Sequence, residues 1–127
     1  MTVKVPDLTE TAVSNPPATA PLNGSFAVTD TVRNQGNGDA GSFTNRYYLS
    51  TNTSKGSGDP LLTGSRAVAG LGAQISSTGT VSVTVPATVA TGVAYFLLAC
   101  ADDLGEIVES SNSNNCRAST TKVTITP

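Results

Sequence analysis

The residues of this chain that are best suited to chemistry gather between positions 97 and 118. Four carboxylates and both cysteines occur there, in the order Cys100, Asp102, Asp103, Glu106, Glu109, Cys116. Ca²⁺ prefers carboxylates and loop carbonyls, so Asp102, Asp103 and Glu109 are candidate calcium ligands. Their spacing does not fit an EF-hand, which needs alternating acids and a central glycine. The competing interpretation is that the acids and Asn side chains of this loop satisfy backbone N–H groups.

The two cysteines are candidates for a disulfide. Cys100 ends one predicted strand and Cys116 begins the next, so they can face each other across an antiparallel pair. Cα atoms of facing residues in such a pair lie about 4.5 to 5.5 Å apart, within the range that a disulfide requires. A bridge would stabilise the fold by roughly 3 kcal/mol and would indicate an oxidising compartment. The alternative is a pair of buried free thiols.

Catalysis is not expected, because the chain contains no histidine. Histidine is the commonest general base, the usual partner in catalytic triads and the commonest metal ligand. A pair of acids for glycoside hydrolysis would have to be held across a sugar-sized cleft, and no pattern in the sequence indicates one. We therefore expect no enzyme and no catalytic residues. We also expect no cofactor, apart from calcium at the acidic loop.

Composition limits the classes of partner. The net charge is −2 and only 13% of residues are charged, so no basic face is available to neutralise nucleic-acid phosphates. No apolar run reaches the roughly 18 residues that span a bilayer. We therefore expect neither nucleic-acid binding nor membrane insertion. The chain begins directly with strand-like sequence, so we expect residues 1–127 to be a single domain cut from a larger protein.

The elements that must position these residues are β-strands, because Thr, Ser and Val are abundant and β-branched residues suit a pleated sheet. Seven strand-like runs are separated by turn residues: 2–14, 25–34, 42–51, 61–71, 75–86, 92–101 and 116–126. Most of them alternate apolar and polar residues, whereas 92–101 is nearly all apolar, as expected of a central strand covered on both faces. The first run is expected to break or bulge at Pro6. The proline-rich segment 15–24 is expected to be a connection.

This pattern predicts an all-β fold, an immunoglobulin-like antiparallel β-sandwich of about seven strands. A barrel is the alternative. With an odd number of strands, the first and last strands run in the same direction, so the two termini should lie at opposite ends. Such a module can be joined head to tail in tandem.

Three residues call for an explanation. Asp30 lies on the apolar side of its strand, and burial of a lone carboxylate is costly. It should therefore have a partner, with Arg46 as the candidate, or a bulge should turn it outward. Tyr48 and Phe96 are expected to share the outer face of neighbouring strands, where a loop or another molecule would cover them.

The order of these motifs resembles the CARDB family, the bacterial cell-adhesion-related domain. The most specific pieces are Asn34-Gln35-Gly36, Tyr48-Leu49-Ser50-Thr51 and the Asp-rich loop that ends in Asn114-Asn115. The similarity covers Pro6 to about Ile125. The resemblance implies a seven-stranded immunoglobulin-like sandwich on a secreted or cell-surface protein, often present in tandem. It brings no catalytic residues.

The sequence as a whole therefore predicts a non-catalytic extracellular structural or adhesion module of a larger secreted or surface protein. Its expected partners are neighbouring domains of the parent chain, and a surface protein or carbohydrate; the domain itself is expected to be a monomer. The alternative is a ligand-binding module that recognises carbohydrate or calcium through the loop 101–115.

Overall fold

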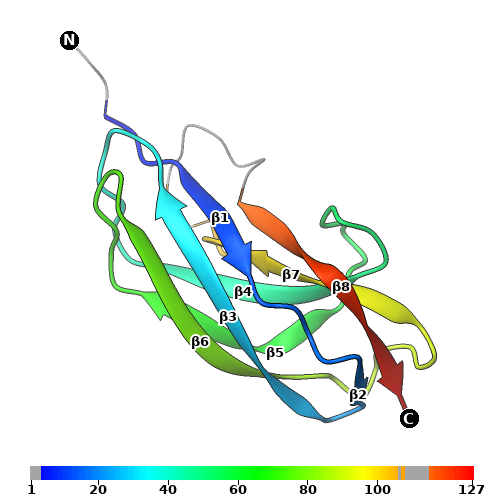
Figure 1. Cartoon of the computed structure of the whole chain (residues 1–127). Coiled ribbons are helices and arrows are strands. Elements are labelled where there is room, and N and C mark those ends of the chain that lie inside the picture. The colour runs from blue at the N-terminus through cyan, green and yellow to red at the C-terminus, as the bar shows by residue number, and fades with distance from the viewer. Residues whose placement is uncertain (1–3, 106, 108–114) are drawn as a thin grey trace.

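The chain forms one strongly curled sheet of β-strands (Figure 1). The computed structural model describes residues 4–105, 107 and 115–127, and these contain no helix. The strands are β1 (Leu8–Val13), β2 (Thr19–Pro21), β3 (Ser25–Asn34), β4 (Phe43–Ser50), β5 (Leu61–Val68), β6 (Ser76–Thr84), β7 (Ala94–Cys100) and β8 (Cys116–Thr126). Their order in the sheet is β1-β3-β6-β5-β4-β7-β8-β2. The predicted all-β, immunoglobulin-like fold is confirmed.

The sheet folds over at β5, so that its two halves face each other across the core. β5 pairs with β4 along most of its length but with β6 at Thr63 and Thr84. Gly64 lies next to this point with φ +121°, and a Cβ atom there would lie 2.7 Å from the carbonyl oxygen of Ser82. Glycine therefore permits the close approach that turns one half of the sheet onto the other.

The N-terminal segment supplies both edge strands of the sheet. β1 pairs antiparallel with β3, and β2, only three residues long, pairs parallel with β8. The prediction that residues 15–24 form only a connection is therefore wrong for residues 19–21. The first strand begins only at Leu8, after the break that was expected at Pro6, and an additional bulge that was not predicted lies between Glu10 and Ala12. Short edge strands limit unwanted pairing with other chains.

The core is filled by the inward-facing residues that the alternating pattern identifies. On β3, Val28, Asp30 and Val32 are buried while Ala27 is exposed, as the period of two requires. β7 is almost wholly buried, as predicted for a strand covered on both faces. The largest buried side chains are Tyr47, Phe43, Leu8, Leu49, Leu62, Leu97, Leu98 and Ile125.

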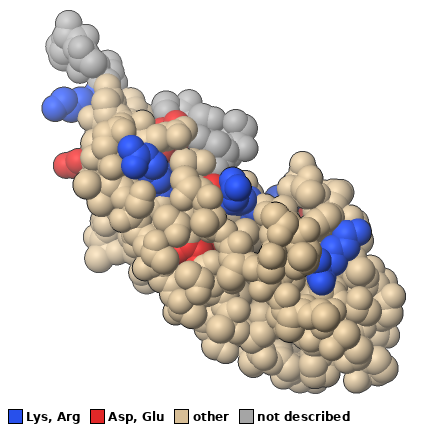
Figure 2. Space-filling view, in the orientation of Figure 1, with Lys and Arg blue, Asp and Glu red and all other residues tan. Residues whose placement is uncertain are grey.

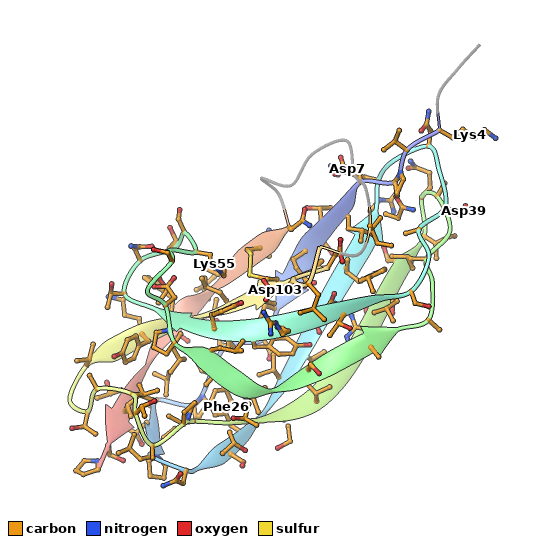
Figure 3. All side chains as sticks on the ribbon, turned by 180° about the vertical axis from the view of Figure 1, so that it is seen from behind. Lys4, Asp7, Phe26, Asp39, Lys55 and Asp103 are labelled. Atoms are coloured by element: carbon orange, nitrogen blue, oxygen red, sulfur yellow. A yellow bond between two sulfur atoms is a disulfide. The ribbon has the colours of Figure 1, made fainter. Side chains whose placement is uncertain are left out.

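The two ends of the domain lie at opposite poles, as predicted. β1 and β8 are related by six antiparallel pairings and so run in the same direction. Lys4 lies at one end in Figure 3, and β8 finishes at the other end in Figure 1.

Charged side chains are sparse on the face drawn in Figure 2, and the basic ones are scattered without forming a continuous patch. Within the described residues, no helix is present that could cross a bilayer.

Candidate functional site

The predicted disulfide is present and joins neighbouring strands of one half of the sheet. Cys100 and Cys116 face each other in the β7–β8 register, with Cα atoms 4.0 Å apart and sulfur atoms 2.07 Å apart. The bridge packs with Tyr48, Leu98 and Ala118 in a small cluster separate from the main core. It therefore fastens the start of the last strand and closes the base of the loop 101–115.

The two described acids of this loop are engaged by the protein itself. Asp102 is buried with φ +49°, and one of its carboxylate oxygens accepts a hydrogen bond of 3.0 Å from the backbone N–H of Ile107. Asp103 accepts hydrogen bonds from the guanidinium of Arg46, at 2.6 Å, and from the hydroxyl of Tyr48. The Asp102 contact is of the kind that the competing interpretation expected, because it satisfies a backbone N–H group, whereas Asp103 is held by two side chains. Glu106 and Glu109 lie outside the described residues.

Asp103 and its partners also change the acid–base properties of their neighbours. The hydrogen bond to Asp103 raises the pKa of Arg46. Burial, followed by the hydrogen bond to Asp103, raises the pKa of Tyr48. Arg46 is thus paired with Asp103, and the prediction that it partners Asp30 is wrong.

A hollow of about 340 Å³ lies beside the disulfide. It is lined by the bridge itself and by Lys55, Asp102, Asp103, Ile107 and Asn115, among others. Figure 3 shows Lys55 and Asp103 close to this part of the molecule. Among the described residues, no group of three or more His, Cys, Asp or Glu side chains is placed to hold a metal ion.

Lysine side chains cover the two aromatic residues of the outer face. The ammonium of Lys55, from the 51–60 loop, lies 4.6 Å from the centre of the Tyr48 ring, which is 7% exposed. Lys122 covers Phe96 in the same way at 4.9 Å. Both arrangements are cation–π contacts. The expectation that a loop covers this face is confirmed for Tyr48, while β8 supplies the cover for Phe96.

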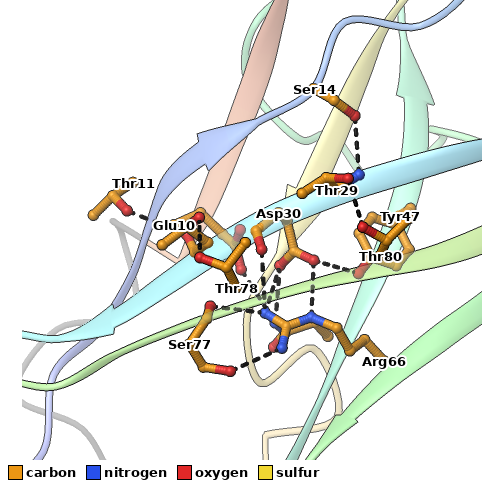
Figure 4. A network of polar contacts seen from close by, with 12 residues as sticks. Glu10, Thr11, Ser14, Thr29, Asp30, Tyr47, Arg66, Ser77, Thr78 and Thr80 are labelled. Atoms are coloured by element: carbon orange, nitrogen blue, oxygen red, sulfur yellow. Dashed lines mark hydrogen bonds and ion pairs between the residues drawn. The ribbon is translucent and has the colours of Figure 1, made fainter.

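The second cluster of reactive groups is a polar network buried between the two halves of the sheet (Figure 4). Asp30, which is fully buried, accepts hydrogen bonds from the hydroxyl of Tyr47 at 2.6 Å and the amide of Asn45 at 3.0 Å. The guanidinium of Arg66 forms an ion pair with the same carboxylate at 3.0 Å. Asp30 therefore has partners, and the alternative in which a bulge turns it outward is wrong.

The side chain of Arg66, on β5, passes over β6 at Gly79 to reach Asp30 on β3. A Cβ atom on Gly79 would lie 2.6 Å from the Cδ atom of Arg66, so a larger residue there would block this path. Beyond this point the guanidinium also donates to the hydroxyl of Ser77 at 3.0 Å and to its carbonyl at 3.1 Å. All of these contacts help to satisfy a charged group that is largely removed from water.

Glu10 brings a second carboxyl group into the same network. It is 3% exposed, and its Oε2 atom lies 3.3 Å from the amide nitrogen of Asn45. Burial raises the pKa of Glu10 to about 10, with a further contribution from the charge of Asp30 and a hydrogen bond to it. Glu10 therefore keeps its proton at neutral pH, beside the ion pair of Asp30 and Arg66.

The network also shifts the pKa values of Tyr47 and Arg66. Burial, together with the hydrogen bond to Asp30, raises the pKa of Tyr47. For Arg66, burial lowers the pKa, but the hydrogen bond and charge of Asp30 outweigh this and raise it overall. These groups are enclosed and mostly bonded to one another, although the Oε1 atom of Glu10 is buried without a hydrogen-bond partner among the described residues.

Sequence reasoning identified Asp30 but missed Glu10 and Arg66. A signal existed for both. Glu10 has the same parity as the buried Leu8, and Arg66 lies four residues after the buried Leu62 on the same side of its strand.

Comparison with known proteins finds a matching family and solved structures with a similar fold. The model of the family described as CARDB matches residues 5–119. A CARDB domain of Pyrococcus furiosus, solved in complex with di-metal ions, is similar with a TM-score of 0.64 and 22% identity, over 98% of this chain and 92% of that one. A domain of a presumed cell surface protein from Methanosarcina acetivorans is similar with the same TM-score and identity, over 94% of this chain and 92% of that one.

More distant similarity extends to parts of larger enzymes. A β-glucosidase from Erythrobacter marinus is similar with a TM-score of 0.54 and 16% identity, over 94% of this chain but only 15% of the enzyme. Comparison with curated proteins gives no match.

Proposed function

Because the chain belongs to the CARDB family, we propose that it is a non-catalytic structural module of a larger extracellular or cell-surface protein, with an adhesive role through the modules beside it. The observation that carries this proposal is the position of the two ends. The chain enters at one pole beside Lys4 and leaves at the other after β8 (Figures 1 and 3). A domain with this geometry separates its two neighbours by its own length.

Two features support a location outside the cytoplasm. Stable disulfides persist mainly in oxidising compartments, and Cys100 and Cys116 are bridged. The similar domain from Methanosarcina acetivorans is described as part of a presumed cell surface protein.

The placement of the ionisable groups favours a passive role. Asp30, Glu10 and Arg66 are enclosed in the core, and the carboxylate of Asp103 is occupied by Arg46 and Tyr48. A catalytic acid or base needs access to a substrate within hydrogen-bonding reach. The fold also forms a small part of the β-glucosidases, which fits a module attached to a larger chain.

The spacer role can be tested on a chain that contains two copies of the domain in tandem, joined by a short linker. Small-angle X-ray scattering should give a maximum dimension close to twice that of a single copy. The single copy measured under the same conditions is the control. A maximum dimension near that of one copy would show that the two copies fold back side by side, and the spacer role would be wrong.

A second candidate function is binding of a divalent cation, for which calcium is the natural probe, or of carbohydrate through the loop 101–115. The hollow beside the disulfide, which Asp102 and Asp103 help to line, favours this candidate. Titration with calcium, and separately with oligosaccharides, should give localised and saturable NMR shifts in this loop if it binds either. No change at millimolar calcium would exclude the cation.

A further inference from the structure

Residues 15–22, which follow β1, run along the second half of β8, from Thr120 to Thr126. Three pairs of residues align in the parallel β2–β8 ladder, from Thr19 with Thr124 to Pro21 with Thr126. The ladder is extended at both ends, because the carbonyl of Ala18 accepts from the N–H of Thr124 at 2.9 Å and the N–H of Leu22 donates to the carbonyl of Thr126 at 3.0 Å. Figure 1 shows this contact at the C-terminal pole.

Asn15 fixes the same segment to β8 at a second point. The β7–β8 register shifts between Phe96 and Leu98, and β8 carries extra residues there. The side-chain oxygen of Asn15 accepts from the backbone N–H of Thr120 at 2.9 Å, from its hydroxyl at 3.0 Å and from the N–H of Thr121 at 3.3 Å. One exposed side chain thus joins the N-terminal segment to a bulge about 105 residues away in sequence.

The direction of these strands decides how they respond to tension. β2 and β8 are parallel, and the two ends of the chain leave from opposite poles. A pull on the two ends reaches residues 15–22 through β1 and draws them toward one pole, while β8 is drawn toward the other, so that the two segments slide along each other. In this shear geometry the cross-strand bonds are loaded at the same time, whereas in a peeling geometry they would break one after another.

We propose that residues 15–22 and β8 form a shear clamp that lets the domain transmit tension between the modules on either side of it, with Asn15 as its pin. This inference rests on the proposed role as a module within a longer chain. The disulfide supports the clamp, because it ties the start of β8 to β7. The rest of β8 pairs with β7 as far as Thr124, so a pull on β8 loads this ladder together with its contact to residues 15–22.

The test is single-molecule force spectroscopy on the full chain, placed between reference domains of known unfolding force. Asn15→Ala should lower the mean unfolding force. The matched control is Asn52→Ala, because Asn52 is also an exposed asparagine whose side-chain oxygen accepts a backbone hydrogen bond, from Ser54 at 3.0 Å, but lies in a loop outside the clamp. Asn15→Asp keeps an acceptor oxygen at the same position and should restore the force.

Equilibrium stability separates a mechanical role from a merely structural one. Both alanine variants expose groups that water can satisfy, so chemical denaturation should show small and similar losses of stability for the two. Complete unfolding events can be recognised by their length. While the disulfide is intact, the chain between Cys100 and Cys116, which are 16 positions apart, cannot be extended by the pull. Reduction of the disulfide should therefore increase the contour length released in each unfolding event by roughly 50 Å.

An unfolding force in Asn15→Ala equal to that of the unmodified chain would overturn the clamp, and so would an equal loss of force in Asn52→Ala. The scattering experiment on tandem copies does not depend on Asn15, so failure of the clamp and failure of the spacer role are distinguishable.

Discussion

Replacement of the buried acid Glu10 by glutamine should make the domain more stable, by an amount that grows with pH. The amide has the shape of a protonated carboxyl group but cannot ionise. In the folded protein the pKa of Glu10 is raised to about 10 from its ordinary 4.5, chiefly by burial and then by the charge of Asp30. The folded state therefore retains a proton that the unfolded state releases above pH 4.5, and the contribution of Glu10 to stability is lost as pH rises.

The magnitude follows from linkage. Each pH unit between the two pKa values costs about 1.4 kcal/mol of folding free energy, because only the folded state holds the proton. At pH 4 the variant Glu10→Gln and the unmodified protein should therefore be nearly equal in stability. At pH 7 the variant should be more stable by about 3 kcal/mol, and the difference should still be growing at pH 9.

Urea denaturation followed by circular dichroism, at pH values from 4 to 9, measures this difference directly. The ¹³C chemical shift of the Glu10 carboxyl carbon gives an independent reading and should keep its protonated value through pH 7. A stability difference that does not change with pH would refute the reasoning. It would mean that Glu10 is ionised in the folded state and shares the charge of Arg66 with Asp30.

Three further experiments test the other contacts. Arg66→Met should cost about 3 to 5 kcal/mol in urea denaturation, because it leaves Asp30 charged and unpaired in the core, whereas Arg46→Met at the partly exposed pair with Asp103 should cost about 1 kcal/mol or less. Equal losses for the two would contradict the network. Removal of the disulfide in a Cys100→Ser, Cys116→Ser double variant should lower stability by roughly 3 kcal/mol, and alkylation of the unmodified denatured protein should add no mass unless a reductant is present. Gly79→Ala should lower the melting temperature because the new methyl group meets Arg66, while Gly41→Ala, which has no atom within 4 Å of a Cβ, should leave it nearly unchanged.

Much of the fold could be predicted because it depends on local patterns. The period of two places Val28, Asp30 and Val32 inside, and the cysteines at the ends of consecutive strands predict their own pairing. The partner of Asp30 could not be found in this way. Arg66 reaches it across 36 residues, through a gap that exists only because Gly79 lies on the strand between them. The strand Thr19–Pro21 escaped prediction because its pairing partner lies at the far end of the chain.

The candidate site, too, could be predicted only in part from the sequence. The sequence located the acids at 102 and 103, but whether they are ligands or caps depends on which groups surround them. Arg46 and Tyr48 come from β4, which was expected to neighbour β7, but the register that brings these two side chains to Asp103 is set only when the sheet is assembled. Alternation along a single strand carries no information about such neighbours.

The bonds between Asn15 and β8 join residues that the ribosome synthesises at nearly opposite ends of this domain. While the polypeptide is being made, the first half of the sheet can assemble, but β2 has no neighbour until β8 has emerged. The nascent domain should therefore remain incomplete until its final residues are released, and a polypeptide shortened before Thr120 should be far more sensitive to proteases than the complete one.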